Sequence, residues 1–220
     1  MHSISRRSSI ALCLALRVTQ AGAAEPLSSP DFSAEIVGRD AAGLPTGPAS
    51  KVFVASGKAR IETPQTPAGF FLVGESAPAL YVLPTQKLVL EAKGSTPLTQ
   101  VFVRLDSSDA CPRWRAAAYD AGVRTDVDWH CERLDSVILD GRRTVRYQVL
   151  EAGRESERWI DAVLAFPVKL KTADGITMAL EHIQMESQRP SLFEVPPDYR
   201  RLDPQALIER VRHSDVWVAP

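Results

Sequence analysis

Polar and apolar residues alternate through most of the second half of the chain, between residues 131 and 199. In one segment Val145, Tyr147 and Val149 are separated by single polar or charged residues. Strict alternation is typical of a β-strand that buries one face. Such segments are separated by turn pairs that contain glycine, at Asp140-Gly141, Ala152-Gly153 and Asp174-Gly175. Because a two-residue turn returns a strand alongside itself, the pattern predicts an antiparallel meander.

The first half of the chain predicts a further set of short strands, at residues 31–38, 51–55, 58–63, 70–75, 79–83 and 87–92. Phe70-Phe71-Leu72-Val73 is apolar at every position, so the sheet must be covered on both faces there. The last long strand changes its apolar face between Leu180 and Ile183. That change predicts a β-bulge near Glu181-His182, or a strand buried on both sides.

Helices are expected in two places. The first is an insertion at residues 96–130, where Thr96 can cap a helix with Pro97 in its first turn, and where residues 114–119 are good helix formers. The second follows Asp203, with an apolar stripe at Leu207, Ile208 and Val211. Strands, a helical insertion, more strands and a final helix predict an α+β fold, with an antiparallel sheet and helices segregated to one side.

Residues 1–24 are predicted to be a signal peptide that is removed, so that the mature chain is exported to the periplasm. Arg6 and Arg7 precede a short apolar run, and Ala21-Gly22-Ala23-Ala24 supplies small residues for cleavage. The arginine pair leaves both the general and the twin-arginine export routes open. Cys13 is expected to be discarded with this segment and not to carry a lipid anchor, since a large residue, Leu12, precedes it.

The mature chain would keep two cysteines, Cys111 and Cys131, and an even count in an oxidising compartment predicts a disulfide between them. A metal site at His130 and Cys131 is not expected, because no CxxC or HxxxH spacing accompanies them. The sequence has a formal net charge of −1, and loss of three arginines with the signal peptide makes it more negative. Nucleic-acid binding is therefore not expected, nor is a transmembrane segment in the mature chain.

Three local patterns resemble the LolA-like, or lipoprotein-carrier-like, superfamily, and most of all its uncharacterised periplasmic domains. They are residues 57–62 with 81–84, residues 139–147, and a closing set at residues 159–161, 166–169 and 192–199. The resemblance implies a single domain at residues 25–200, built as an incomplete half β-barrel whose strongly curved sheet has helices over its concave side. Residues 201–220 would add a C-terminal helix and an extended tail.

By the same resemblance, the space between sheet and helices would hold an acyl chain or another hydrophobic group. Residues that could line such a pocket are Phe53, Phe71, Tyr81, Val145, Tyr147, Trp159 and Met178. The same side chains could instead fill a core, and the sequence leaves this open. We therefore expect a non-enzymatic protein that binds a lipid or a lipidated protein. The alternative is an interaction module of a cell-envelope assembly with a protein partner.

A hydrolase is a third and weaker hypothesis. Asp161 and Glu181 could form a pair of catalytic carboxylates, but they could equally pair with neighbouring cations. A cysteine in a disulfide cannot act as a nucleophile beside His130. No serine lies in the sharp turn that an esterase requires. No catalytic residue, metal or cofactor is expected.

Overall fold

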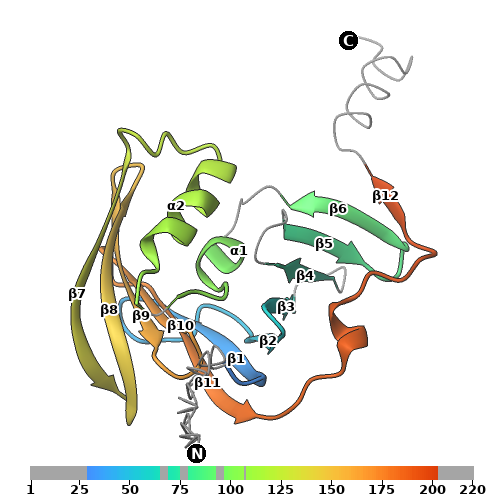
Figure 1. Ribbon diagram of the computed structural model, residues 1–220, viewed down its shortest axis with the longest axis horizontal. Helices are drawn as coiled ribbons and strands as arrows, with labels where there is room; N and C mark the ends of the chain where they lie inside the picture. Colours follow the sequence, from blue (N-terminus) through green and yellow to red (C-terminus); the bar gives the residue numbers. More distant parts are fainter. Residues whose placement is uncertain (1–28, 65–68, 75–78, 93–96, 107, 203–220) are drawn as a thin grey trace, which may run out of the picture.

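The computed structural model describes residues 29–64, 69–74, 79–92, 97–106 and 108–202. Twelve strands of this part of the chain form one sheet, in the order β12-β6-β5-β4-β3-β2-β1-β11-β10-β9-β8-β7. All neighbouring strands are antiparallel except β12 and β6, which are parallel. The sheet is neither closed nor strongly curled, and the two short helices lie on one of its faces, between its two halves (Figure 1).

The strands of the first half are β1 (Phe32–Arg39), β2 (Ser50–Ala55), β3 (Lys58–Glu62), β4 (Phe70–Val73), β5 (Ala79–Leu83) and β6 (Leu88–Ala92). The helices are α1 (Pro97–Val101) and α2 (Cys111–Asp120). The remaining elements are β7 (Trp129–Leu139), β8 (Arg142–Glu151), β9 (Arg154–Asp161), β10 (Phe166–Thr172), β11 (Thr177–Met185), the 3-10 turn η1 (Pro190–Phe193) and β12 (Arg200–Leu202).

The main hydrophobic core lies between the sheet and the two helices, on what we call the inner face of the sheet. Trp114 of α2 meets Tyr147 of β8 edge to face, with ring centroids 5.6 Å apart. Phe166 contacts Phe32 of β1 and Phe102, which follows α1, at centroid distances of 5.4 and 6.4 Å. Pairs of this geometry add to the stability gained by burying the rings. One core therefore joins the helices to both halves of the sheet.

The predicted hairpins of the second half are confirmed. At the β7–β8 turn, Asp140 and Gly141 have φ of 49° and 76°, and at the β8–β9 turn Ala152 and Gly153 have φ of 50° and 76°. Two consecutive residues with positive φ define the turn that matches the twist of paired strands. Glycine at the second position adopts this conformation without steric cost, which explains the turn pairs in the sequence.

The predicted bulge in the last long strand is also confirmed. Between β1 and β11, Ser33 pairs with Gln184 whereas Glu35 pairs with Glu181, so two residues of β11 stand opposite one of β1. His182 in this bulge has a φ of 53°. The extra residue moves the side chains that follow it to the other face, as the apolar pattern required.

A second, smaller core lies on the outer face of the sheet, opposite the helices. Phe70, Leu72, Val82 and Val89 are buried there, and Val195 and Tyr199 pack against them. The segment after η1 thus covers the outer face of β4–β6. Coverage of Phe70–Val73 on both faces, predicted from its composition, is confirmed for Phe70, Leu72 and Val73, while Phe71 stays half-buried.

The observed fold differs from the prediction in three respects. It is mainly β, with only two short helices in the described residues, so α+β overstated the helical part. The sheet is less curved than the half-barrel that was expected. β12, placed parallel to β6, was not predicted. The helices expected near Pro97 and at residues 114–119 are confirmed as α1 and α2, while the one expected after Asp203 lies outside the described residues.

Candidate functional site

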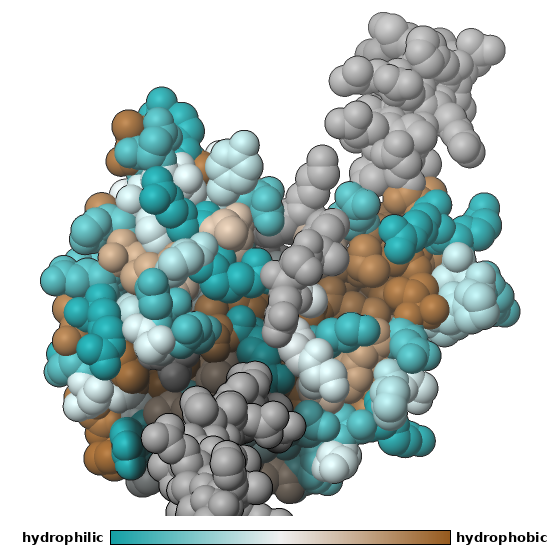
Figure 2. Space-filling model, in the orientation of Figure 1, coloured by the Kyte–Doolittle hydropathy of each residue, from teal (hydrophilic) through white to brown (hydrophobic). Residues whose placement is uncertain are grey.

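Five half-buried apolar side chains lie together on the inner face of β4–β6: Phe71, Tyr81, Leu83, Leu88 and Leu90. Phe71 pairs with Tyr81, Tyr81 with Leu90, and Leu83 with Leu88. Residues opposite each other in a sheet share a face, and so do alternate residues along a strand. We call this set the apolar face. Figure 2 shows hydrophobic surface over this part of the sheet, beside the helices.

The apolar face differs from the two cores in how it is packed. Phe71 and Tyr81 lie against each other, with ring centroids 4.8 Å apart. Phe71 also packs against the main core, but Tyr81, Leu83, Leu88 and Leu90 belong to neither core. Within the described residues, these four side chains therefore form a hydrophobic surface that is only partly covered. A contiguous surface of this kind is typical of an interaction or ligand-binding site.

Gly69 helps to shape the apolar face. A Cβ atom at this position would lie 2.5 Å from the Tyr81 hydroxyl oxygen and within 3 Å of its ring. The absence of a side chain at Gly69 thus leaves room for the Tyr81 ring beside Phe71. At the other end of β4, the Arg113 guanidinium of α2 donates a hydrogen bond of 2.8 Å to the Gly74 carbonyl. Arg113 therefore links α2 to the strand that carries Phe71.

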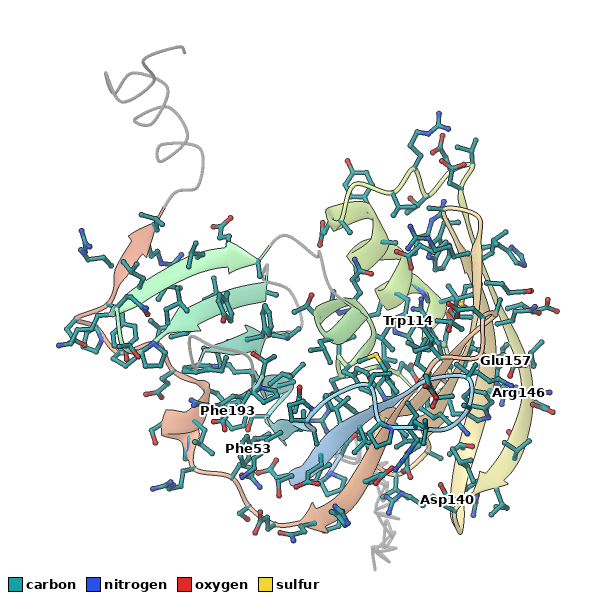
Figure 3. All side chains as sticks on the ribbon, turned by 180° about the vertical axis from the view of Figure 1, so that it is seen from behind. Phe53, Trp114, Asp140, Arg146, Glu157 and Phe193 are labelled. Atoms are coloured by element: carbon teal, nitrogen blue, oxygen red, sulfur yellow. A yellow bond between two sulfur atoms is a disulfide. The ribbon has the colours of Figure 1, made fainter. Side chains whose placement is uncertain are left out.

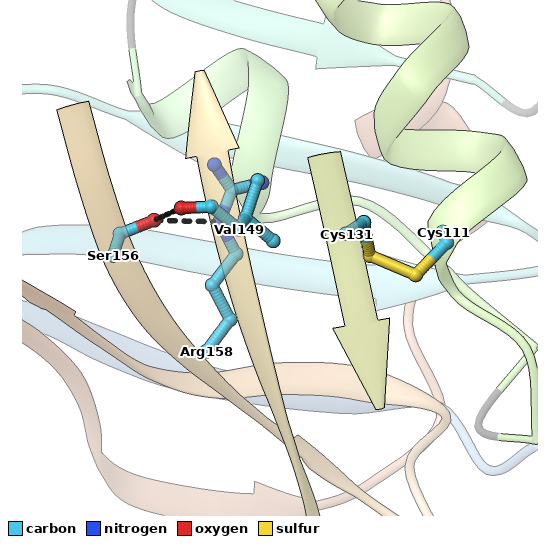
Figure 4. Close-up of a disulfide and its surroundings, with 5 residues drawn as sticks. All are labelled: Cys111, Cys131, Val149, Ser156 and Arg158. Atoms are coloured by element: carbon cyan, nitrogen blue, oxygen red, sulfur yellow. Dashed lines mark hydrogen bonds between the residues drawn. A yellow bond between two sulfur atoms is a disulfide. The ribbon is translucent and has the colours of Figure 1, made fainter. Parts of the chain in front are cut away.

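The other half of the inner face is filled by α2. Tyr147 of β8 is buried against Trp114, and Val145 of the same strand is also buried. The predicted disulfide between Cys111 at the start of α2 and Cys131 of β7 is present, with the two Cα atoms 5.7 Å apart (Figure 4). It holds the helix against this part of the sheet, which leaves Val145 and Tyr147 as packed core.

The remaining residues predicted to line a pocket lie elsewhere. Phe53 alternates with the buried Val52 and Val54, so it lies on the outer face, on the side of Phe193 (Figure 3). Trp159 lies opposite Lys169, whose ammonium is 5.4 Å from the centre of its ring, and faces away from α2. Met178 is half-buried at the edge of the main core, next to Leu170. Of the seven candidates, the structure brings only Phe71 and Tyr81 together on the apolar face.

Sequence reasoning did not single out Leu83, Leu88 and Leu90. A signal was nevertheless present, because Tyr81 and Leu83 alternate before a four-residue turn and Leu88 and Leu90 alternate after it. Two strands joined by such a turn pair side by side, and their alternate apolar residues meet on one face. The turn fixes Leu83 opposite Leu88, which extends the surface started by Phe71 and Tyr81.

A buried arginine sits beneath α2. Arg158 of β9 lies 4.9 Å from the centre of the Trp114 ring and 3.3 Å from the Glu151 carboxylate. Its Nε donates to the hydroxyl of Ser156, which in turn donates to the Val149 carbonyl (Figure 4). Burial lowers the pKa of Arg158 to about 10, and the Glu151 carboxylate offsets only part of that effect. These contacts satisfy the guanidinium within the fold, so its role is structural.

The carboxylates considered for catalysis have structural partners. Asp161 is buried, accepts hydrogen bonds of 2.8 Å from the amides of Val163 and Leu164, and pairs with Arg142. Glu181 pairs with Arg39 at 2.6 Å. Within the described part of the chain, no three histidine, cysteine, aspartate or glutamate side chains are grouped closely enough to hold a metal ion. Neither described helix has the length and hydrophobicity needed to cross a lipid bilayer.

Comparison with known proteins finds likeness of structure without likeness of sequence. No protein-family model and no curated protein matches the sequence. PNGF-II matches with a TM-score of 0.52 and 7% identity, over 84% of this chain and 33% of its own. MucB, also solved in complex with MucA(peri), matches with a TM-score of 0.42 and 12% identity, over 78% of this chain and 59% of its own.

A LolA superfamily protein from Nitrosomonas europaea matches with a TM-score of 0.35 and 10% identity, over 76% of this chain and 91% of its own. The chain thus spans about a third of PNGF-II and less than two thirds of MucB. At these identities the matches concern the fold alone. The chain is structurally similar to LolA superfamily proteins and MucB, the first of which is the superfamily that its sequence resembles.

Proposed function

We propose that this chain is a non-enzymatic periplasmic protein that binds a hydrophobic or acylated group on the apolar face, between the sheet and the helices. The observation that carries the proposal is the partly covered surface formed by Tyr81, Leu83, Leu88 and Leu90, which lies outside both cores. None of these four side chains carries a charge. Water in contact with them is released when an apolar group covers them, and that release favours binding.

The ligand is expected to be elongated and apolar. The apolar face crosses three neighbouring strands, so it is about 10 Å wide between β4 and β6. A linear chain laid across it would contact side chains of all three strands. Each methylene group transferred from water contributes about 0.8 kcal/mol, so two further methylenes tighten binding about tenfold while the chain still fits.

The Cys111–Cys131 disulfide supports the proposed compartment, because structural disulfides persist in oxidising environments such as the periplasm. The signal peptide predicted at residues 1–24 lies outside the described residues and agrees with export. Both support a compartment in which the apolar face would meet lipids and lipidated proteins.

Titration of the delipidated full chain with saturated fatty acids of eight, ten and twelve carbons tests the proposal. We expect the dissociation constant to fall about tenfold for each two carbons added, until the face is filled. Leu90→Asp places a carboxylate on the apolar face and should weaken binding at least tenfold. Leu150→Asp is the control for the charge itself, because Leu150 is an exposed leucine on β8, in the other half of the sheet.

Equal affinity for the three fatty acids, or equal loss of affinity in the two aspartate variants, would contradict a hydrophobic site on β4–β6. Capture of a stoichiometric protein that Leu90→Asp abolishes, without any fatty-acid binding, would instead support an interaction module that uses the same surface.

A further inference from the structure

A cavity of about 550 Å³ lies in the other half of the sheet from the apolar face. It is lined by the end of β1, by β10 and β11, and by the turn between β7 and β8, whose Asp140 is labelled in Figure 3. Pockets that bind small molecules have volumes of roughly 300 to 1,000 Å³. The size of this cavity therefore suits a small organic molecule.

Part of the lining is apolar, and the main core holds it in place. Val168 and Leu180 are buried members of that core, and the half-buried Leu139 and Ile183 pack against it. We call these four side chains the apolar wall. Because core side chains are closely packed, the wall has a fixed shape against which an apolar group can lie.

Lys169 supplies a positive charge to the cavity. Its ammonium lies 5.4 Å from the centre of the Trp159 ring, a contact that favours a cation over the ring. Within the described residues, no carboxylate is close enough to form an ion pair with Lys169. Arg39 of the same lining differs, since it pairs with Glu181 at 2.6 Å. Lys169 is thus available to an anion.

Arg142 also lines the cavity, and a buried carboxylate fixes its orientation. Its Nε donates to Asp161, which accepts hydrogen bonds of 2.8 Å from the amides of Val163 and Leu164. The two terminal nitrogens of Arg142 donate to no other residue that the structure describes. Two such nitrogens side by side can bind both oxygens of a carboxylate. Asp161 is therefore a positioning residue for Arg142.

We propose that this cavity binds a small organic acid, which is a carboxylate attached to a short apolar or aromatic body. Lys169 and Arg142 bind the carboxylate, and the apolar wall contacts the body. A ligand with one negative charge is expected, because Asp161 already balances Arg142, so that Lys169 is the cation to be neutralised. The site does not depend on the proposed function, which uses β4–β6.

The first experiment titrates the full chain with benzoate and follows the indole N–H NMR signal of Trp159, assigned with Trp159→Phe. Binding should shift this signal saturably, because the anion attracts the ammonium that lies over the ring. Lys169→Met keeps an apolar stem over Trp159 but removes the charge, and it should weaken benzoate binding at least tenfold. An unchanged dissociation constant in this variant would overturn the proposal.

The matched control is Lys171→Met. Lys171 is an exposed lysine of the same strand that does not line the cavity, so its replacement should leave benzoate binding unchanged. Equal losses in the two methionine variants would overturn the proposal, because they would reflect the net charge of the protein and not a site.

The second experiment replaces benzoate by acetate, which carries the same carboxylate without the aromatic body. Acetate should bind at least tenfold more weakly, since it does not cover the apolar wall. Equal affinity for the two acids would overturn a site that includes the wall.

Leu90→Asp separates this inference from the proposed function. Benzoate should bind this variant as tightly as the wild type, and a loss of benzoate binding would overturn the inference by placing the anion on the apolar face. If benzoate binds as expected but no fatty acid of eight to twelve carbons binds the chain, the organic-acid site stands and the proposed function is wrong.

Discussion

Gly69 illustrates how a single residue supports the apolar face. A methyl group at this position would meet the ring and hydroxyl of Tyr81, whereas at Gly74 no atom of the described residues beyond its chain neighbours lies within 4 Å of the corresponding point. We expect Gly69→Ala to displace the Tyr81 ring from Phe71 and to lower the free energy of unfolding by about 1–3 kcal/mol, as overpacking does. Urea unfolding and near-ultraviolet circular dichroism would measure the two effects.

The control for this prediction is Gly74→Ala, at the other end of β4. It should change the stability by less than half as much and leave the aromatic signal intact. Equal effects of the two substitutions would show that the space above Gly69 is not what holds Tyr81.

The burial of Arg158 leads to a second prediction, which concerns the stability of the fold and its dependence on pH. Its folded pKa of about 10 lies below the ordinary value, so above about pH 10 the unfolded chain binds more protons than the folded chain. Stability from this group therefore rises with pH in that range, and at pH 7 the cost of burying the charge is fully present. Glu151→Gln removes the carboxylate that pairs with this guanidinium and should destabilise the fold by about 3 kcal/mol at pH 7.

The matched variant is Arg158→Met/Glu151→Gln, which removes the buried charge as well. It should recover most of the lost stability in urea unfolding at pH 7. The penalty of Glu151→Gln alone should shrink as the pH rises toward 10, because the unpaired guanidinium loses its proton at a lower pH than the paired one. A double variant as unstable as the single one would contradict the idea that an unpaired buried cation causes the loss.

Single residues also show what the sequence could not predict, namely which face of the sheet a side chain lies on. Alternation shows that Phe53 lies on the opposite face of its strand from Val52, and that Trp159 lies on the opposite face of its strand from Arg158. It does not show which of the two faces of a strand meets the helices, because that depends on the register between strands. The result was a list of seven aromatic and aliphatic residues of which Phe71 and Tyr81 share a surface.

At the scale of elements, the disulfide joins α2 to β7 across a sequence separation of 20 residues. Closing a loop of that length stabilises a fold by about 3 kcal/mol. We expect Cys111→Ser/Cys131→Ser to lower the free energy of unfolding by about that amount, measured in urea. Dithiothreitol should lower the stability of the wild type in the same way and should not affect the double variant. A wild type insensitive to reductant would contradict the prediction.

Elements that local chemistry determines were predictable. Asp140-Gly141 and Ala152-Gly153 specify tight turns through positive φ, and Pro97 marks the first turn of α1. β12 was not predictable, because Arg200-Arg201-Leu202 is too short for a strand signal and has no alternation of polar and apolar residues. Its parallel pairing with β6 depends on the preceding segment crossing the outer face, where Lys87 contacts Asp198 at 2.7 Å.

At the scale of the whole molecule, the two halves of the sheet are supported unequally. The main core joins β1–β3, the helices and β7–β11 and reaches β4 and β5 at Val73 and Ala79. The rest of β4–β6 lies on the smaller outer core and has a partly covered inner face. Regions with less buried apolar surface open at a lower free energy. We expect amides of β5, β6 and β12 to exchange with deuterium faster than those of β8–β10, as measured by mass spectrometry. Equal protection throughout would show that the sheet opens as one unit.

The global shape was the least predictable property. Apolar alternation determines which residues are buried, but the degree of curling depends on twist and bulges summed over twelve strands. A half-barrel and a more open sheet can have the same alternation, so the expected curvature came from the resemblance alone. The candidate site differs accordingly. The sequence predicted a hollow between the sheet and the helices, whereas the structure has a partly covered surface on β4–β6.

An open sheet has two outer strands whose backbone amides and carbonyls could recruit further chains into fibres. The bulge in β7 between Arg133 and Ser136 interrupts that ladder near its middle, and Asp135, held by Arg146 at 2.9 Å, puts charge at the break. At the opposite margin, β12 offers only three residues, two of them arginines. The molecule can thus leave its sheet unclosed without becoming a template for aggregation.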